Sequence, residues 1–375
     1  MNLDYSDEQK LLKDQARKFL SERCTSQRVR VVLDDADKSF DAELWKEMAE
    51  LGWMGVAIPE TYGGLGQSRV ELCAIAEELG RACAPVPFSS SIYGAAEALL
   101  LAGTSQQQER WLPGVANGSA IGTLAFVESP GPLSTRSIQT SIVAGKVSGT
   151  KRAAIDGDIA NFAIVLAKDG KGLSLFVVDL NVATVRRTKV STLDPTRSAA
   201  NIEFARATAE RLGNAGDGLE SIARIYDRMA VYLAFEQIGG ADQCLEMAVE
   251  YAMHRFAFGR AIASYQAIKH KLVNLYAKNQ IARSNAYYGA WALNDDANEL
   301  PLAAATARVA ACDAYWFAAK ENIQTHGGMG FTWAADCHLY YRRARQLGLA
   351  IGAARVWRER LVQQLIVQQL TASAA

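Results

Sequence analysis

The stretch HRFAFGRAIASYQAIKHK, residues 254–271, interrupts a long apolar pattern. Across residues 219–251, apolar side chains repeat at the three- and four-residue spacing of a buried helix. This spacing predicts one long helix that ends near Phe256. Gly259 then frees the backbone, and a second helix is expected to start near Tyr265. The interruption therefore divides two long helices of a helical domain.

Three side chains of differing chemistry surround this interruption: Arg255, Phe258 and Gln266. A guanidinium, an aromatic ring and an amide at a helix break suit a large planar ligand that bears phosphates. The alternative is structural, because an arginine and a phenylalanine at a helix end are more often a solvated charge and a core aromatic. Taken alone, the stretch leaves both interpretations open.

Length and composition restrict the classes of protein that the chain can be. Its 375 residues are half hydrophobic, which predicts two or three domains with room for a ligand cavity. Forty basic and forty acidic residues give a formal net charge of zero, without a long run of either sign. The sequence therefore disfavours nucleic-acid binding.

Six cysteines and four histidines show no paired spacing of the kind that metal sites use, so no metal site is predicted. The cysteines are expected to be buried free thiols in a reducing compartment. The N-terminal stretch carries acidic residues and lacks a continuous apolar core, so it predicts neither a signal peptide nor a membrane span. We therefore expect a cytoplasmic protein.

Three segments with different residue patterns follow one another along the chain and predict an α+β fold. Residues 1–118 read as a helical domain, although glycines in PETYGGLG (59–66) leave a phosphate loop as a minor alternative. Residues 119–208 consist of short β-favouring runs without a helix-length stretch between them, which predicts an antiparallel barrel or sandwich. Residues 209–375 predict a four-helix bundle. Its helices are expected at 219–255, 265–294, 301–326 and 334 to about 370.

A second interruption occurs in IQTHGGMGFTW, residues 323–333. Gly327, Gly328 and Gly330 follow Gln324 and break an apolar pattern. Glycines at such a place allow the backbone to approach a ligand closely, but a tight turn between helices requires them equally.

Both interruptions and their surroundings closely resemble the acyl-CoA dehydrogenase family. The resemblance is carried by RFAFG followed by YQAIKHKLVNL, and by IQTHGGMGFTW followed by YYRRAR. It also covers the opening YSDEQKLLKDQARKFL, the PETYGGLG turn and VSGTKRAAIDGDIANFAIVLA in the β segment. The resemblance implies a helical, a β and a four-helix domain, usually assembled as a tetramer that binds FAD.

The resemblance also implies which residues contact the flavin. In the family, the arginine, phenylalanine and glutamine of the first motif contact the diphosphate and adenosine side, which places Arg255, Phe258 and Gln266 there. The second motif, often from a neighbouring subunit, offers its glutamine and glycine backbone to the same diphosphate. These residues correspond to Gln324, Gly327 and Gly328 in this chain.

The chain departs from the family at the catalytic base, which is usually a glutamate that removes the α-proton of the thioester. The commonest position for this glutamate falls on Ile351, and a second one falls on Met229. Neither side chain can accept a proton. Glu236, two turns from Met229 on the same helix face, and Asp227, which points elsewhere, are the remaining candidates. Both could equally be solvated or capping side chains.

The β segment departs at the redox end of the flavin. Where many members have a hydroxyl residue before a Glu-Pro-Gly segment, this chain has Val127. The usual Trp-x-Thr is Ala153-Ala154-Ile155. These changes remove hydrogen bonds and stacking that would tune the ring. The mixture looks like the paired chains of bacterial sterol and dicarboxylate degradation, which assemble as α2β2.

The resemblance therefore implies an FAD-dependent enzyme that oxidises an acyl-CoA to a 2,3-enoyl-CoA and passes electrons to an electron-transferring flavoprotein. The chain would act as a homotetramer or as one subunit of an α2β2 heterotetramer. Two alternatives stay open. One is a catalytically silent chain that completes a sister chain's flavin site, and the other is a flavin enzyme that reacts with oxygen.

Overall fold

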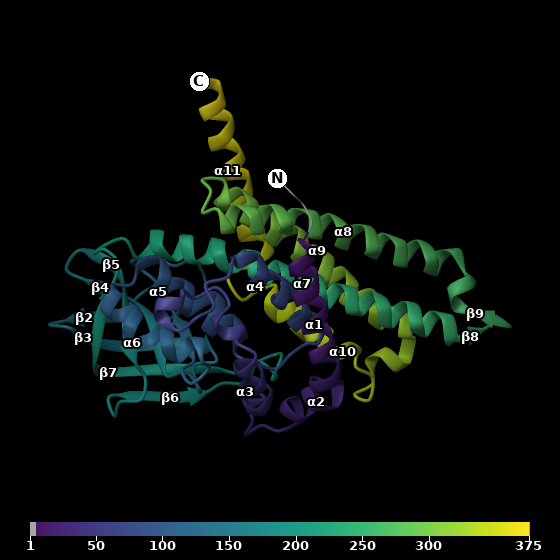
Figure 1. The fold of residues 1–375 in the computed structure, drawn as a ribbon, viewed down its shortest axis with the longest axis horizontal. Helices are drawn as coiled ribbons and strands as arrows, with labels where there is room; N and C mark the ends of the chain where they lie inside the picture. The colour runs from purple at the N-terminus through teal and green to yellow at the C-terminus, as the bar shows by residue number, and fades with distance from the viewer. Residues whose placement is uncertain (1–4, 375) are drawn as a thin grey trace. The chain divides into compact units, whose positions relative to one another are not determined.

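The computed structural model describes residues 5–374, which pack as two compact units. The barrel unit contains Arg30–Ser68 and Pro85–Met229, and the helical unit contains the chain up to Val29, Arg69–Ala84 and the chain from Ala230. Each predicted segment has the predicted secondary structure, in the predicted order (Figure 1). The domain boundaries at residues 118 and 208 stay predictions.

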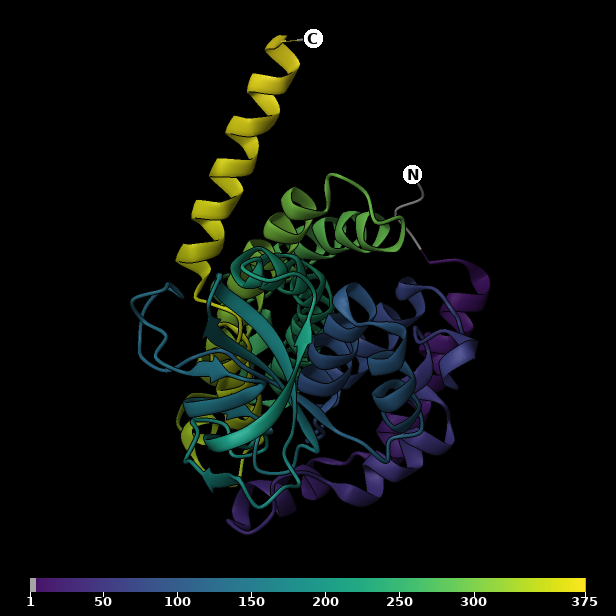
Figure 2. The same ribbon diagram turned by 90° about the vertical axis from the view of Figure 1, so that its left-hand side faces the viewer.

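The barrel unit is built around a seven-stranded sheet that closes on itself. Strands β4, β2, β3, β7 and β5 pair in that order, and β5 pairs with β4 to complete the ring, so the predicted barrel is confirmed (Figure 2). β1 extends the sheet beside β4, and β6 beside β7. The strands are β1 (Gly122–Ala125), β2 (Ser141–Val143), β3 (Lys146–Ile155), β4 (Phe162–Asp169), β5 (Gly172–Asp179), β6 (Val185–Lys189) and β7 (Ala199–Leu212).

The expectation of a purely antiparallel sheet needs a correction. β1 pairs with β4 in parallel, with Gly122 opposite Phe162, and β2 also meets β4 in parallel at Ser141. The expectation assumed that a parallel pair needs a helix as its crossover. Here the β2–β3 hairpin lies in the chain between β1 and β4 and makes that crossover instead.

Helices accompany the barrel within its unit. They are α3 (Ala42–Glu50), α5 (Glu97–Ala102), α6 (Ser105–Ala116) and a π-helical segment η3 (Ser89–Ala96), together with the 3-10 turns η1 (Trp53–Gly55) and η2 (Glu60–Tyr62). The first part of α7 (Gly218–His254) also belongs to this unit. The wide π-helical turn, a form often found at functional sites, was not predicted.

The helical unit consists mainly of long helices that run antiparallel. They are α1 (Asp7–Arg23), the start of α2 (Ser26–Asp34), α4 (Arg69–Arg81), the rest of α7, α8 (Gln266–Asn294), α9 (Leu300–His326), α10 (Cys337–Leu347) and α11 (Ala354–Ala374). Ser6 caps α1 through a capping box with Gln9, and Pro301 lies in the first turn of α9. No helix among residues 5–374 is long and apolar enough to span a membrane.

The last predicted helix, 334 to about 370, is wrong in one respect. It consists of two helices, α10 and α11, with a break between Leu347 and Ala354. Gly352 lies in this break with φ +102°, a conformation that side chains with a Cβ rarely adopt. Ile351, also in the break, is 5 % exposed. The apolar periodicity continues across the break, which is why the sequence suggested one helix.

Helices α4 and α7 cross with their backbones in contact. A Cβ at Gly80 would lie 1.8 Å from the carbonyl oxygen of Glu236, and a Cβ at Gly239 would lie 1.8 Å from that of Glu77. Only glycine fits at either place. The crossing therefore fixes how the N-terminal helices of the helical unit join its bundle.

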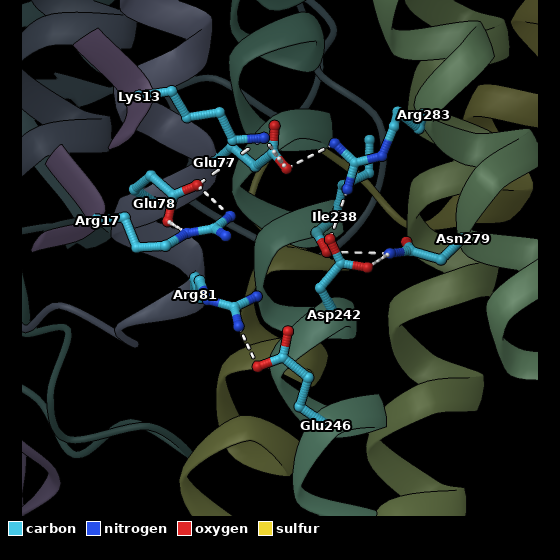
Figure 3. Close-up of polar contacts among 10 residues, drawn as sticks. All are labelled: Lys13, Arg17, Glu77, Glu78, Arg81, Ile238, Asp242, Glu246, Asn279 and Arg283. Carbon is cyan, nitrogen blue, oxygen red and sulfur yellow. Dashed lines mark hydrogen bonds and ion pairs between the residues drawn. The ribbon is translucent and has the colours of Figure 1, made fainter. Parts of the chain in front are cut away.

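Charged side chains surround this crossing and connect four helices (Figure 3). Arg283 of α8 donates from Nη1 to Oε1 of Glu77 on α4 at 2.6 Å, and from Nη2 to Asp242 on α7. Lys13 of α1 lies 2.7 Å from the same Glu77 oxygen. Arg17 of α1 pairs with Glu78 through two hydrogen bonds of 3.0 and 2.9 Å. The acids and bases of this network are balanced, and Glu77 and Glu78 are each 1 % exposed.

Candidate functional site

The first interruption forms a small hairpin between α7 and α8. α7 ends at His254, strands β8 (Phe256–Ala257) and β9 (Arg260–Ala261) pair, and the turn η4 (Ile262–Ser264) leads to α8 (Figure 1). Phe258 (φ +52°) and Gly259 (φ +79°) form the two-residue turn, which requires positive φ at both positions. The predicted end and restart of the helices are thus confirmed.

Tyr265 fixes the hairpin to the start of α8. Its hydroxyl donates to the carbonyl oxygen of Ala257 at 3.0 Å, and the guanidinium of Arg260 lies 3.9 Å from its ring centroid. The amide of Ile262 donates to the carbonyl of Arg255 at 2.8 Å. These contacts hold the hairpin so that Phe258 at its tip is 97 % exposed. Sequence reasoning used Tyr265 only as a helix start and missed this positioning role.

The second interruption is a glycine turn at the end of α9. Gly327 adopts φ +60° and begins the 3-10 turn η5 (Gly327–Phe331). Nothing lies within 4 Å of a Cβ placed on Gly327 or Gly328, whereas a Cβ on Gly330 would lie 2.5 Å from the carbonyl oxygen of Ile323. Gly330 therefore serves the turn itself. The space beside the first two glycines is open.

A ring stack joins the two interruptions. Tyr251, in the last turn of α7, stacks on His326, the last residue of α9, with ring centroids 4.2 Å apart. Nδ1 of His326 lies 2.9 Å from the carbonyl oxygen of Asn322, which gives this histidine a structural role at the helix end. Arg255 is one helical turn beyond Tyr251, and Gln324 is two residues before His326. One chain therefore brings both motifs to the same end of its bundle.

All six residues assigned to the cofactor by resemblance are exposed at this end: Arg255, Phe258, Gln266, Gln324, Gly327 and Gly328. Within residues 5–374, the Arg255 guanidinium takes part in no ion pair. Large apolar side chains accompany them, with Phe256 64 % and Phe331 82 % exposed. Exposed aromatic surface of this extent beside an unpaired arginine is typical of a binding site or a subunit interface.

Three comparisons with known proteins agree with this arrangement. Residues 6–119 match the model of the acyl-CoA dehydrogenase N-terminal domain, and residues 216–366 match that of the acyl-CoA dehydrogenase C-terminal domain. The chain belongs to the acyl-CoA dehydrogenase family. Members of this family are FAD-dependent oxidoreductases.

Relatives across the acyl-CoA dehydrogenase family match nearly the whole chain. The acyl-CoA dehydrogenase IpdE2 of Mycobacterium tuberculosis is 32 % identical over 90 % of this chain and 91 % of its own length. The structure of the ChsE4–ChsE5 complex from Mycobacterium tuberculosis matches at 26 % identity with a TM-score of 0.88, covering 98 % of this chain and 99 % of that one. A variant of the Tcur3481–Tcur3483 steroid ACAD matches at 29 % identity with a TM-score of 0.86, covering 97 % and 99 %.

The exposed residues of the bundle end fit the nucleotide part of FAD. A diphosphate carries negative charge, and Arg255 presents a planar fork of donors that forms no ion pair with the described part of the chain. The amide of Gly327 already donates to the carbonyl oxygen of Gln324, and the space beside Gly327 and Gly328 is open to a phosphate oxygen. Phe258 and Phe331 offer apolar area beside them. The donor types and the open space both suit the group.

The glycine loop PETYGGLG does not fit a phosphate. The amides of Gly63, Gly64 and Gly66 donate to the carbonyls of Glu60, Pro59 and Ile58 at 2.9, 3.2 and 2.9 Å. A Cβ on Gly64 would lie 2.0 Å from the Ile58 carbonyl oxygen. These amides have no donor left for a ligand, so the loop is a structural turn.

The redox end of the family site is altered in the barrel unit. Val127 is 42 % exposed and has no hydroxyl to donate. Ala153 adopts φ +50° in a β-bulge, where its amide donates to Oδ1 of Asn201 at 3.1 Å. Neither residue supplies the hydrogen bond or the indole that many family members place beside the ring. The strand backbone is therefore present here, but the hydroxyl and indole side chains that many family members place beside the flavin ring are absent at these positions.

Glu128, which follows Val127, is occupied by internal bonds. Its carboxylate lies 2.5 Å from Nζ of Lys151 and accepts from the amides of Gln139 and Thr140. Burial lowers the pKa of Lys151 to about 8, and the Glu128 carboxylate opposes this shift. Desolvation acts to raise the pKa of Glu128, but the bonds from Lys151 and the backbone outweigh it and leave that pKa lowered. This ion pair connects the loop between β1 and β2 to strand β3, which contains Lys151.

Both usual positions of the catalytic glutamate are buried and apolar. Ile351 is 5 % exposed, and its carbonyl accepts from Nε1 of Trp357 at 3.1 Å. Met229 is 6 % exposed and its Cε lies 3.5 Å from where a Cβ of Gly94 would be. Gly94 is part of the π-helical segment η3. Neither position offers a proton acceptor.

Of the two candidate carboxylates on α7, Glu236 is a poor replacement. Glu236 is fully buried and lies 3.5 Å from Arg343, itself fully buried. Arg343 also donates to the carbonyls of Cys83 and Ala84 beyond the end of α4. This pairing gives Glu236 a structural role in holding the helices together. Asp227 is 3 % exposed in the barrel unit.

Proposed function

We propose that this chain is one subunit of an FAD-dependent acyl-CoA dehydrogenase. The assembled enzyme would remove hydrogen from the α- and β-carbons of an acyl-CoA thioester, form a 2,3-enoyl-CoA, and pass the electrons to an electron-transferring flavoprotein. FAD, when bound, supplies the acceptor for the hydride. The chain itself would hold the nucleotide end of the flavin, and a sister chain would supply the base.

One combined observation carries the proposal. The two helix interruptions meet at one end of the bundle through Tyr251 and His326, whereas Ile351 and Met229, at the usual base positions, are buried and apolar. Exposed aromatic rings lie at this end beside the Arg255 guanidinium and two glycines with open space around them. Exposed apolar surface of this kind is unfavourable in water and indicates a ligand or partner. Because neither usual position can accept a proton, a base from another chain would complete the family chemistry.

The most informative relatives support a heteromer. The names of two similar structures each join two proteins, ChsE4 with ChsE5 and Tcur3481 with Tcur3483. The second is called a steroid ACAD, which makes a bulky, ring-derived acyl-CoA the first substrate class to test. An α2β2 assembly in the cytoplasm is the expected form. The six cysteines are all free and buried, which suits a reducing compartment.

The competing function is a dehydrogenase that turns over without a sister chain, as a homotetramer. Asp227, two residues before Met229 on α7, is the carboxylate that would then have to act as the base. Its position beside Met229 on the same helix keeps this second candidate open.

Purification of the chain alone separates these functions. The proposal predicts that the chain binds little FAD, or binds it without being bleached by acyl-CoA, and that a co-expressed sister chain restores both. Yellow protein that bleaches alone with acyl-CoA and an electron acceptor would instead support the single-chain enzyme. Rapid reoxidation of reduced flavin by air would indicate an oxygen-reactive enzyme.

A further inference from the structure

The helical unit contains a cavity that the proposed function does not use. The cavity has a volume of about 370 Å³ and lies among α1, the start of α2, the end of α4, and helices α7 and α10. All residues that line it belong to the helical unit, and none of the candidate flavin or base residues is among them. Its volume falls in the range of roughly 300–1,000 Å³ in which small-molecule sites are found.

The floor of this cavity is apolar. Leu20 of α1, Val29 of α2 and Leu339 of α10 line it and are buried. The half-buried Met247 of α7 lines it as well. A ligand that rests on this floor removes apolar surface from water, and the gain in free energy grows with the area covered. The ligand is therefore expected to have an apolar body.

Two arginines give the cavity a polar side. Arg17 of α1 bonds to Glu78 through Nε and Nη2, and Arg81 of α4 bonds to Glu246 through Nη2 (Figure 3). In the described part of the chain, neither arginine uses Nη1 in a hydrogen bond. Both arginines line the cavity and so keep donors that a ligand can use.

The charges around the cavity restrict the head group of the ligand. Among the described residues that line it, Arg17 and Arg81 are the cations, and Glu78 and Asp336 are the carboxylates. Because the two signs balance, a phosphate monoester with two negative charges would meet no surplus of positive charge. A single carboxylate instead has the planar shape that matches guanidinium donors. The lining therefore favours a monocarboxylate over a phosphate.

We propose that this cavity binds a small carboxylic acid. The carboxylate lies at Arg17 and Arg81, and the apolar body lies against Leu20, Val29 and Leu339. A ligand in this position contacts α1, α2, α4 and α10 at once, so its binding stabilises the helical unit. The inference concerns no flavin contact and does not rest on the proposed function.

The walls of the cavity are held in place before the acid binds. The hydroxyl of Tyr340 on α10 donates to the carbonyl oxygen of Arg81 at 2.9 Å. The two hydrogen bonds between Arg17 and Glu78 join α1 to α4 on the other side. A preformed cavity of this kind loses little conformational entropy when a ligand enters.

Calorimetric titration and thermal unfolding of the full-length chain test the proposal, with octanoate as the probe and 1-octanol as its uncharged counterpart. We expect octanoate to bind saturably and to raise the unfolding temperature. Arg81→Gln should weaken octanoate binding about ten-fold, because a hydrogen bond between charged groups is lost. Lys18→Gln, at an exposed lysine of α1 that does not line the cavity, should bind octanoate as the wild type does. The alcohol should bind more weakly than the acid and be insensitive to Arg81→Gln.

Ser21→Trp is a second variant, at a residue that lines the cavity and is exposed. The added indole should cover the opening and abolish octanoate binding, while the circular dichroism spectrum stays that of the wild type. Absence of saturable binding to the wild type, or an unchanged affinity in Arg81→Gln, would overturn the proposal. Binding that persists in Ser21→Trp would place the acid elsewhere in the protein and also overturn it. Equal affinity for 1-octanol and octanoate would show that the arginines do not recognise the carboxylate, with the same consequence. No readout requires bound flavin, so this inference and the proposed function can fail separately.

Discussion

Tyr251 and His326 stack with ring centroids 4.2 Å apart and an interplanar angle of 28°. This contact links the last turn of α7 to the end of α9, two points 75 residues apart in the sequence. Lys271 and Glu321, 2.9 Å apart, connect α8 to α9 near the same end. The two helix interruptions are thus parts of one surface, and the predicted cofactor residues lie on it.

The first prediction concerns this stack. Replacing Tyr251 with alanine should cost about 1–3 kcal/mol of unfolding free energy, because an aromatic pair and partly buried area are lost. It should also lower the FAD content of the purified protein, since the ends of α7 and α9 would no longer be held together. Urea unfolding and the absorbance of the bound flavin measure the two effects. Tyr276→Ala, at a tyrosine that is 54 % exposed on α8, serves as the control and should change neither quantity much.

The second prediction concerns the ion-pair network at the α4–α7 crossing. Glu77→Gln should destabilise the fold by about 3 kcal/mol, because Arg283 and Lys13 would lose their shared buried carboxylate. The control is Glu246→Gln, at a side chain 56 % exposed and paired with Arg81, with an expected cost below about 1 kcal/mol. Equal losses for the two variants would contradict the special role of the buried carboxylate.

The same network predicts a pH dependence of stability. Desolvation acts to raise the pKa of Glu77, but Arg283 and Lys13 outweigh it and leave the pKa lowered. The folded pKa is below the unfolded one, so Glu77 stabilises the fold above its ordinary pKa of 4.5, and this contribution is lost as pH falls further. Desolvation leaves the pKa of the neighbouring Glu78 raised, so Glu78 acts in the opposite direction as pH falls. Thermal melts from pH 7 to 3 should show a smaller acid-induced loss for Glu77→Gln than for the wild type.

A third prediction tests the glycine crossing. Gly239→Ala should lower the unfolding free energy by about 1–3 kcal/mol, because its Cβ would overlap the Glu77 carbonyl. Helix propensity alone predicts the opposite sign, a gain of up to about 1 kcal/mol. Gly170→Ala, in a turn with nothing within 4 Å of the added Cβ, is the matched control and should be nearly neutral. A stabilised Gly239→Ala variant would show that α4 and α7 are farther apart than described.

The fourth prediction follows from the buried lysine of the barrel unit. The folded pKa of Lys151 is about 8, below its ordinary value of 10.5, and burial is the main cause. The unfolded chain therefore binds more protons between these values, and stability from this group rises with pH. Between pH 7 and 9.5 the gain amounts to about 2 kcal/mol relative to Lys151→Met. Lys46→Met, at an amine 79 % exposed, should keep the wild-type pH profile in the same urea titrations.

Much of the fold could be predicted because local signals agreed with the tertiary structure. The periodicity before Phe256 and the glycines of both motifs are read from a few neighbouring residues, and the structure confirms the helix ends they predict. The break between α10 and α11 was missed, because the apolar periodicity continues across it. Gly352 has a φ of +102° in this break, and the indole of Trp357 donates to the carbonyl of the preceding Ile351.

The site was harder to predict where it depends on contacts distant in sequence. Nothing near Tyr251 indicates that His326 will stack on it, and nothing near Glu236 indicates that Arg343 will bury beside it. The parallel pairing of β1 with β4 was missed for the same reason, since the crossover is made by another hairpin. The assignment of Arg255, Phe258, Gln266, Gln324, Gly327 and Gly328 to the flavin stays a prediction.

The most direct test of the account is equilibrium binding of FAD to the full-length chain, with its sister chain where binding requires one, compared with the Arg255→Ala variant. The account predicts that this variant loses at least 90 % of the bound flavin, because the charge that faces the diphosphate is gone. This loss corresponds to about 2 kcal/mol or more of binding free energy. Circular dichroism should show an unchanged helix content. Arg224→Ala, at an exposed arginine on the same helix, should keep wild-type binding. Full retention of flavin by Arg255→Ala would contradict the central claim that the two helix interruptions form the nucleotide site.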